Sequence, residues 1–153
     1  METCNNHQQC IDSAIHRAEN VCLKHSMHFT PLRRNILELI WQSHIPLKIN
    51  DISKQLEQNN QAVKPISVYR VLDFLLEYGM IHKLVSQNSF LGCSHPGEKH
   101  NCYFIICKKC YKVEEVCTNN LLSDIAQSLN KLNFIPEHIT FEVQGICKEC
   151  HQS

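Results

Sequence analysis

Two short stretches near the C-terminal end of the chain carry the same pair of thiols. "IICKKC" ends with Cys107 and Cys110, and "GICKEC" ends with Cys147 and Cys150. Each Cys-x-x-Cys turn can hold two thiolates about 2.3 Å from one metal ion, so two turns complete a tetrahedral structural zinc site. Redox-active dithiols use the same spacing. Because neither pair has a thioredoxin-like context, we favour zinc.

A second and less regular group of possible metal ligands precedes and overlaps the first. It offers imidazole, thiol and carboxylate donors, which suit a mixed zinc site with more exchangeable binding than four thiolates. The candidates are His82, Cys93, His95, His100, Cys102, Glu114 and Glu115. Residue type and spacing do not select four ligands from this group. Each histidine taken singly is also compatible with an ordinary surface or hydrogen-bonded residue.

The N-terminal stretch "METCNNHQQC" has ligand-like spacing between Cys4 and Cys10, but its position favours a frayed terminus. It has neither the basic start nor the apolar stretch of a secretory signal, and no apolar run is long enough to span a membrane. We therefore expect a soluble cytoplasmic protein, in which cysteines serve as metal ligands or redox thiols more often than as structural disulfides. Cys22 and Cys117 are expected to be buried.

The first half of the chain contains the elements that would position a DNA-binding surface. Apolar spacing predicts helices over residues 10–26, 29–43, 48–59 and 66–78. Thr30 is the expected N-cap of the second helix, Pro31 its first residue, and Gly79 the end of the last helix. Alternation in "MIHKLVSQNSFLGC" then predicts two strands that turn around Gln87 to Ser89. Helices followed by such a hairpin make a winged helix.

The last helix of a winged-helix domain enters the major groove, so its exposed face is the candidate DNA-binding surface. Ser67, Tyr69 and Arg70 lie on that face, and Lys64 lies just before it. A solvated helix face accounts for each residue taken singly. A net charge of zero argues against a nonspecific polyanion binder, although it is compatible with basic residues gathered on one face.

The second half of the chain has the pattern strand, turn, strand, helix, strand. Such a small unit buries little core and exposes strand edges, which predicts pairing with a second copy. We therefore expect an α+β protein of three parts: a winged-helix DNA-binding domain at 1–84, a hinge with metal ligands at 85–100, and a dimerisation domain with structural zinc at 101–153.

The stretches "FTPLRRNILELI" and "PISVYRVLDFLLEYGMIHKL" and the two Cys-x-x-Cys pairs resemble the ferric uptake regulator family over roughly residues 10 to 150. "VYRVLDFLLEYGMIHKLVSQNSFLGC" and the absence of a histidine-rich run before the first thiol pair resemble its zinc-sensing subgroup. The resemblance implies a homodimeric, zinc-activated repressor with two zinc ions per subunit. It would bind an AT-rich double-stranded operator upstream of zinc-import genes, with no membrane partner and no small-molecule substrate.

The resemblance also assigns roles to individual residues. The structural zinc ligands would be Cys107, Cys110, Cys147 and Cys150, and the regulatory ligands would be His82, Cys93, His100 and Glu115. His100 and Glu115 are chosen by their spacing from the first thiol pair, and His95 remains a rival to His100. Tyr69 and Arg70 match the family's DNA-contacting pair, and Arg33 matches an arginine of the family's "TP-Q-R" motif, with Leu32 in place of glutamine.

Two alternatives follow from the same residues. An iron, manganese or peroxide sensor of the same family would use a similar fold, although the sulfur of Cys93 favours zinc. A zinc-dependent enzyme could use His82, Cys93 and His100 as ligands with Glu114 as base. The sequence lacks the zinc-deaminase pattern and an HExxH helix, so we expect no enzyme.

Overall fold

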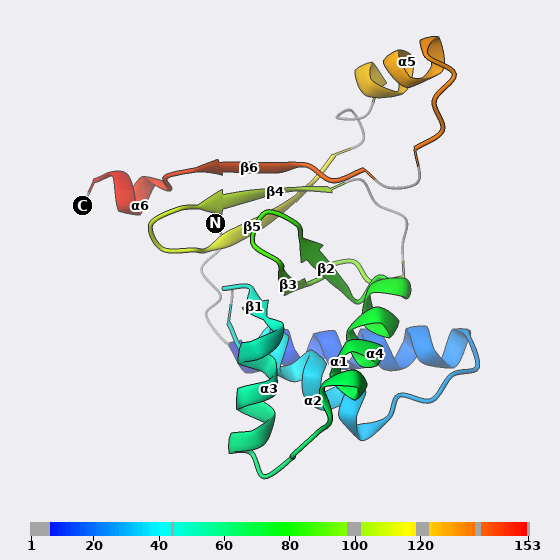
Figure 1. Cartoon of the computed structure of the whole chain (residues 1–153), viewed down its shortest axis with the longest axis vertical. Helices are drawn as coiled ribbons and strands as arrows, with labels where there is room; N and C mark the ends of the chain where they lie inside the picture. Colours follow the sequence, from blue (N-terminus) through cyan, green and yellow to red (C-terminus); the bar gives the residue numbers. More distant parts are fainter. Residues whose placement is uncertain (1–6, 44, 98–101, 119–122, 137–138, 153) are drawn as a thin grey trace. The chain divides into compact units, whose positions relative to one another are not determined.

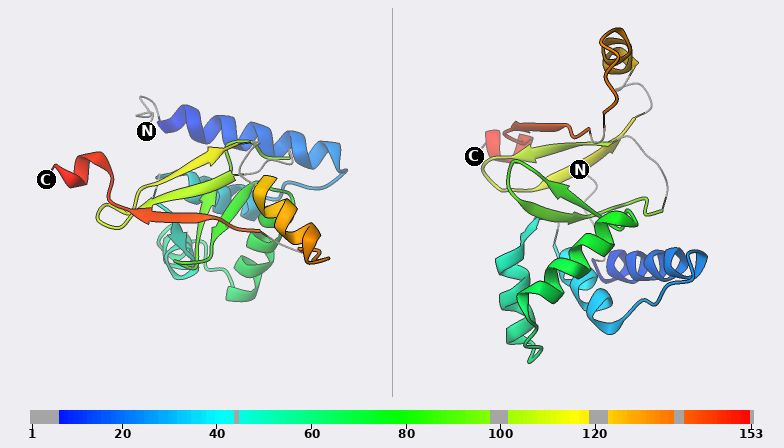
Figure 2. Two further views of the ribbon diagram at one scale, coloured as in Figure 1. Left: turned by 90° about the horizontal axis from the view of Figure 1, so that it is seen from above. Right: turned by 45° about the vertical axis from the view of Figure 1, so that its right-hand side comes forward.

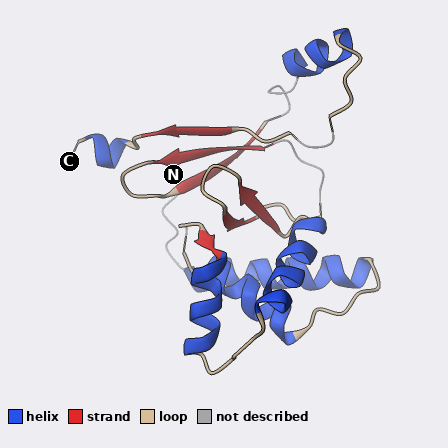
Figure 3. Cartoon of the chain, viewed as in Figure 1, coloured by secondary structure: helices blue, strands red, loops and turns tan. Residues whose placement is uncertain are grey.

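The computed structural model describes residues 7–43, 45–97, 102–118, 123–136 and 139–152. The chain divides into two compact units, Met1–Glu98 and Lys99–Ser153. The first unit is mainly helical and the second contains a three-stranded sheet (Figure 3). This mixture confirms the predicted α+β class. Within the described part of the chain, no helix is long and apolar enough to cross a membrane.

The elements of both units are labelled in Figure 1. The first unit contains α1 (His7–Lys24), α2 (Pro31–Trp41), β1 (Leu47–Lys48), α3 (Ile49–Gln58), α4 (Pro65–Glu77), β2 (Ile81–Leu84) and β3 (Ser89–Gly92). The second contains β4 (Cys102–Cys107), β5 (Val113–Cys117), α5 (Ser123–Lys131), β6 (Glu142–Gly145) and α6 (Lys148–His151). The short elements β1 and α6 were not expected.

The core of the first unit lies between the apolar faces of its helices. The side chains of Ile36 and Leu37 on α2 and of Val68 and Leu75 on α4 are at most 1% exposed. Burying one such side chain stabilises the fold by about 1.5 to 3 kcal/mol. The start of α2 is as predicted, because Thr30 accepts a hydrogen bond from the N–H of Arg33 and Pro31 is the first helical residue.

Gly79 ends α4 and turns the chain toward the hairpin. Its φ of 63° lies in the left-handed region that glycine adopts without a Cβ penalty. Its N–H donates to the carbonyl of Leu76, and the next N–H, that of Met80, donates to the carbonyl of Leu75. These bonds satisfy carbonyls that a helix end leaves open, as predicted for this glycine.

The hairpin consists of the antiparallel strands β2 and β3, with β1 on the other side of β3. Leu84 pairs with Ser89, so the turn occupies residues 85–88 and Ser89 is a buried strand residue. The expected position of the turn was therefore too far along the chain. Because Ser89 is buried and paired with Leu84, the turn ends one residue earlier, at Asn88, whose φ of 48° is a conformation that asparagine tolerates.

The sheet of the second unit has the strand order β5-β4-β6. Strand β4 is antiparallel to β5 and parallel to β6, and Figure 2 shows the three strands side by side. Cys107 at the end of β4 pairs with Gly145 at the end of β6. The two Cys-x-x-Cys turns therefore leave the sheet at the same end, although they are far apart in sequence.

Candidate metal centres and nucleic-acid interface

The two Cys-x-x-Cys turns bring four thiols together. The Sγ atoms of Cys107, Cys110, Cys147 and Cys150 all lie within 4.8 Å of one another. The sulfurs of Cys110 and Cys147 are 3.8 Å apart. A tetrahedron with metal to sulfur distances of 2.3 Å has an edge of about 3.8 Å. The four side chains therefore fit a tetrahedral zinc ion.

The surroundings of these thiols favour thiolate at one position and oppose it at another. Backbone N–H groups of Cys110 and Cys147 donate toward Cys107 and lower its pKa to about 6. The N–H of Cys150 also lowers the pKa of Cys147, but the Glu149 carboxylate, desolvation and the neighbouring sulfurs outweigh it and raise that pKa to about 12. Four thiolates this close repel one another, so full deprotonation needs a cation among them.

His82 and Cys93 approach each other within the first unit. His82 pairs with Leu91 across the hairpin, and the N–H of Cys93 donates to the carbonyl of Met80 at 3.0 Å. Cross-strand partners share a face of the sheet, and so do residues two apart on one strand. Because Leu91 pairs with His82 and lies two residues before Cys93, the side chains of His82 and Cys93 project to the same side. A ring nitrogen of His82 and the Sγ of Cys93 lie within 4.8 Å of each other. The pair can supply two ligands to one metal ion.

His95 contacts Cys93 through its backbone. Its N–H donates to the Sγ of Cys93 at 3.4 Å. Among the described residues, no three-donor group joins His95 to both His82 and Cys93. Its rival His100 lies outside the described residues, so the choice between them stays a prediction.

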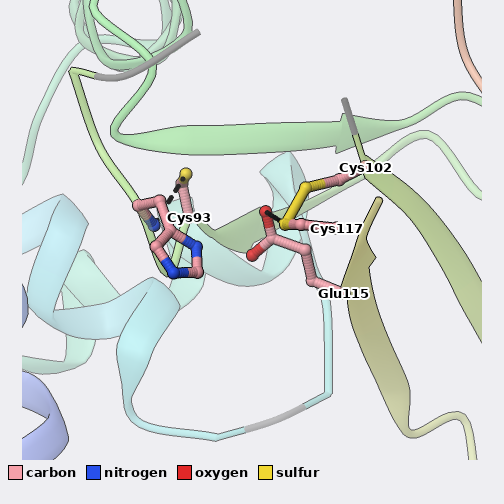
Figure 4. The surroundings of a disulfide bond; sticks show 5 residues. Cys93, Cys102, Glu115 and Cys117 are labelled. Atoms are coloured by element: carbon pink, nitrogen blue, oxygen red, sulfur yellow. Dashed lines mark hydrogen bonds between the residues drawn. A yellow bond between two sulfur atoms is a disulfide. The ribbon is translucent and has the colours of Figure 1, made fainter. Parts of the chain in front are cut away.

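Glu115 lies on β5 of the second unit, where it pairs with Phe104 of β4. Its side chain is half-buried, and its Oε1 lies 3.8 Å from the Sγ of Cys117. Cys117 was expected to be buried, and this was wrong, because its side chain is exposed at the end of β5. It forms a disulfide with Cys102, which Figure 4 shows beside Glu115.

The disulfide also runs against the expectation that spaced cysteines of this chain avoid disulfide pairing. The pairing could have been found in the sequence. The first thiol pair forms the turn between two predicted strands, and counting outward from that turn places Cys102 opposite Cys117, as the observed register does. The general preference for reduced cysteines hid this local signal.

The cysteines of the first unit other than Cys93 belong to α1 or lie before it. Cys22 is 2% exposed and is part of the core, as predicted. Cys10 is half-buried and belongs to no group of three possible ligands among the described residues. Cys4 lies outside the described residues, so the structure does not test whether Cys4 and Cys10 bind a metal ion.

The outer face of α4 presents most of the predicted DNA-binding residues. Tyr69 is 51% exposed, Arg70 and Lys64 are exposed, and Ser67 is half-buried. Ile66, which the sequence analysis did not single out, is 55% exposed on the same helix. The surface therefore combines two cations with an aromatic and an aliphatic side chain, which suits contacts to phosphates and to base edges.

Arg33 is engaged within the first unit. Its guanidinium carbon lies 3.4 Å from the ring centroid of Phe74 on α4, and its Nη1 donates to the carbonyl of His28. These contacts join α2, α4 and the segment before α2. They give Arg33 a packing role that its motif match did not indicate.

The chain matches the sequence profile of the ferric uptake regulator family over residues 24–144. The chain belongs to this family. Ferric uptake regulator proteins are transcription regulators rather than enzymes.

Several of the proteins to which this chain is similar are zinc uptake regulators. The zinc uptake regulation protein of Escherichia coli K12 is 33% identical over 136 residues, which cover 88% of this chain and 79% of that protein. A zinc uptake regulator complexed with zinc and DNA superimposes with a TM-score of 0.86 at 29% identity, covering 97% of both chains. Holo XcZur gives 0.83 at 34% identity, covering 92% of this chain and 99% of its own.

Proposed function

We propose that this protein is a zinc-responsive transcriptional repressor that binds operator DNA as a homodimer when zinc-loaded and controls zinc uptake genes in the cytoplasm. The observation that carries this proposal is the similarity, along almost the whole chain, to a zinc uptake regulator complexed with zinc and DNA. The fold, the donor atoms and the exposed face of α4 each supply a part that such a repressor needs.

The tightly held zinc would be bound by Cys107, Cys110, Cys147 and Cys150. Zinc there would cross-link the two Cys-x-x-Cys turns, which already lie at the same end of the sheet. Lys109 supports the same arrangement, because its Nζ donates to the carbonyl of Cys150 at 2.9 Å. This site would be structural, since four thiolates leave no open coordination position.

The regulatory zinc would be bound by His82, Cys93, His100 and Glu115. Nitrogen, sulfur and oxygen donors hold zinc less tightly than four thiolates, which suits a site that fills and empties with the supply of free zinc. These ligands come from both units of the chain. Zinc binding at this site would therefore favour the arrangement in which the two recognition helices of a dimer are spaced to fit the two half-sites of the operator.

Operator recognition would use the exposed face of α4. Arg70 is the candidate for reading a guanine edge, and Tyr69 for contacting thymine methyl groups or phosphate. Lys64, Ser67 and Arg33 would contact the phosphate backbone. Because phosphate contacts release counterions, operator affinity should fall steeply as salt rises.

The second unit carries the apolar surface that a dimer would bury. Ile105 on β4, Val143 on β6 and Ile146 after it are between 42% and 54% exposed. Apolar side chains at the face and edge of a small sheet favour association with a second copy. This is consistent with dimerisation through residues 101–153.

The first experiment is capture of the organism's fragmented genomic DNA on chelator-treated protein while buffered free zinc is raised. Iron(II) and manganese(II) are tested in parallel. We expect zinc-dependent enrichment of a few AT-rich fragments, which would also identify the regulated genes. Enrichment with another metal would identify a sister sensor, and no enrichment with any metal would refute the proposed function.

Replacement of Cys93 tests the regulatory site separately. Cys93→Ser should leave folding and the tightly held zinc unchanged while abolishing zinc-dependent operator binding, because hydroxyl is a poor zinc ligand. Circular dichroism, zinc content and operator affinity report these properties. Cys10→Ser is the control and should bind the operator normally. Unfolding of the Cys93 variant would instead assign this cysteine a structural role.

A further inference from the structure

The β4 and β5 hairpin carries sulfur at both ends. Its closed end bears Cys107 and Cys110, and its open end bears the disulfide between Cys102 and Cys117. We propose that Cys102 and Cys117 form a reversible dithiol and disulfide site, oxidised by peroxides, whose state sets the zinc affinity of the neighbouring Glu115 site. The link to zinc rests on the proposed role of Glu115; the redox site itself does not.

The strand register brings these two cysteines together without help from metal. Cys102 is the first residue of β4, Cys117 is the last residue of β5, and the two are direct cross-strand partners. Their Cα atoms are 4.1 Å apart, which resembles the close approach of non-hydrogen-bonded pairs in antiparallel sheets. Either redox state is therefore compatible with the same hairpin.

The position of the pair suits reversible chemistry. Cys117 is exposed and Cys102 is half-buried, so a small oxidant or a reductant can reach the sulfur of Cys117. A repressor that acts on bacterial DNA works in a compartment where thioredoxin and glutathione keep thiols reduced. Disulfides in that compartment are usually transient or redox-sensing rather than permanent supports.

Oxidation by hydrogen peroxide balances with no other reactant. The thiolate of Cys117 attacks one peroxide oxygen, the O–O bond breaks, and the products are a sulfenic acid and one water molecule after proton transfer. Cys102 then attacks the sulfenic sulfur, the S–S bond forms, and the hydroxyl leaves as a second water molecule. Two electrons pass from the two sulfurs to peroxide. A dithiol reductant returns them and becomes a disulfide itself.

The consequence for zinc follows from the 3.8 Å between the Sγ of Cys117 and the Oε1 of Glu115 (Figure 4). In the reduced state, the Cys117 sulfur could supply a further zinc ligand beside the carboxylate, with its thiol proton passing to solvent. In the disulfide the same sulfur carries no charge and is a poor zinc ligand. Peroxide should therefore weaken zinc binding at the regulatory site and release the operator.

The experiment compares zinc-loaded full-length protein before and after hydrogen peroxide, and again after a dithiol reductant. Alkylation, digestion and mass spectrometry report whether the Cys102 and Cys117 peptides are linked. Competition with a chromogenic chelator reports zinc affinity, and a labelled operator reports DNA binding. We expect a reversible link and a loss of at least about tenfold in affinity for the weaker zinc. In Cys102→Ser the linked peptide and the tenfold loss should both be absent.

The outcomes separate this inference from the proposed function. If reduced protein binds its operator with zinc but peroxide never links the two peptides, the redox site is refuted and the repressor is retained. If the link forms while zinc affinity stays the same, the regulatory consequence is refuted. If reduced protein shows no zinc-dependent operator binding, the proposed function fails, and peptide linkage still decides whether the redox site exists.

Discussion

Arg33 shows how a residue of a family motif can act through packing. The central carbon of its guanidinium lies 3.4 Å from the ring centroid of Phe74, while Nη1 donates to the carbonyl of His28. A stacked guanidinium on a buried ring typically contributes about 0.5 to 2 kcal/mol. Since Phe74 belongs to α4, Arg33 helps to fix the position of the helix that carries Tyr69 and Arg70.

Substitution of Arg33 can separate packing from phosphate contact. Arg33→Lys keeps the charge but loses the planar group that stacks, so it should lower the free energy of unfolding by about 1 kcal/mol. Operator affinity should fall with it. Chemical denaturation and operator titration at several salt concentrations measure both. A lysine variant with unchanged stability and affinity would show that charge alone matters at this position.

Arg70 has the opposite character, because it is exposed on α4 and suited to direct contact with a base. Arg70→Ala should weaken operator binding by about 1 to 3 kcal/mol, or roughly 5- to 150-fold, with zinc content and unfolding temperature unchanged. Glu77→Ala, near the end of the same helix, is the matched control and should bind normally. Loss of zinc from the Arg70 variant would contradict this assignment.

Strand β3 packs directly on α2, and Gly92 allows this contact. A Cβ at Gly92 would lie 2.2 Å from Cε2 of Trp41, so no larger residue fits without movement of the indole ring. The close approach places the end of β3, and therefore Cys93, against the helical core. Here a residue with no side chain positions a proposed metal ligand.

Gly92→Ala should therefore destabilise the first unit by about 1 to 3 kcal/mol through overpacking against Trp41. The weaker zinc should also bind less tightly, since Cys93 follows directly. Gly145→Ala is the control, because a Cβ there meets nothing within 4 Å. Thermal unfolding and tryptophan fluorescence distinguish the two variants. Equal stability of both would mean that Trp41 moves aside at little cost.

Long periodic elements of this chain were predictable from sequence, and short ones were not. Helix α4 carries apolar residues at helical spacing and ends at a glycine, so local chemistry and packing give the same answer. On the same helix Phe74 is also buried, and its ring lies against the guanidinium of Arg33. Strand β1 has two residues and exists through its pairing with β3, which no local pattern encodes.

The candidate sites also differ in how far they could be predicted from the sequence. The four-thiol group follows from a repeated Cys-x-x-Cys pattern, because each pair is local and only the meeting of the pairs depends on the fold. The mixed ligands are scattered over the hairpin and β5, so residue types alone left several choices open. Their assignment rested on family resemblance. The disulfide depends on strand register, which a composition-based view of cysteine does not consider.

The stability of the second unit should depend on the zinc that would link its two Cys-x-x-Cys turns. Cys150→Ser should remove the tightly held zinc, reduce zinc content by about one ion per subunit, and loosen the unit, because structural zinc contributes several kcal/mol or more to folding. Dimerisation should weaken at the same time. Metal analysis, calorimetry and sedimentation measure these effects. His151→Ala, one residue further on α6, should retain both zinc and dimer; if it does not, the loss is not specific to the thiol.

Because β4 and β6 pair in parallel, the positions of the two thiol pairs do not depend on the length of the chain between these strands. Cys107 and Gly145 are neighbours in the sheet, so the segment that contains α5 leaves and returns without setting the distance between the thiol pairs. Doubling the length of a flexible loop costs only about 0.6 kcal/mol in closure entropy. Related proteins can therefore gain or lose residues between β5 and β6, or carry an inserted binding module there, while keeping the same four-sulfur centre.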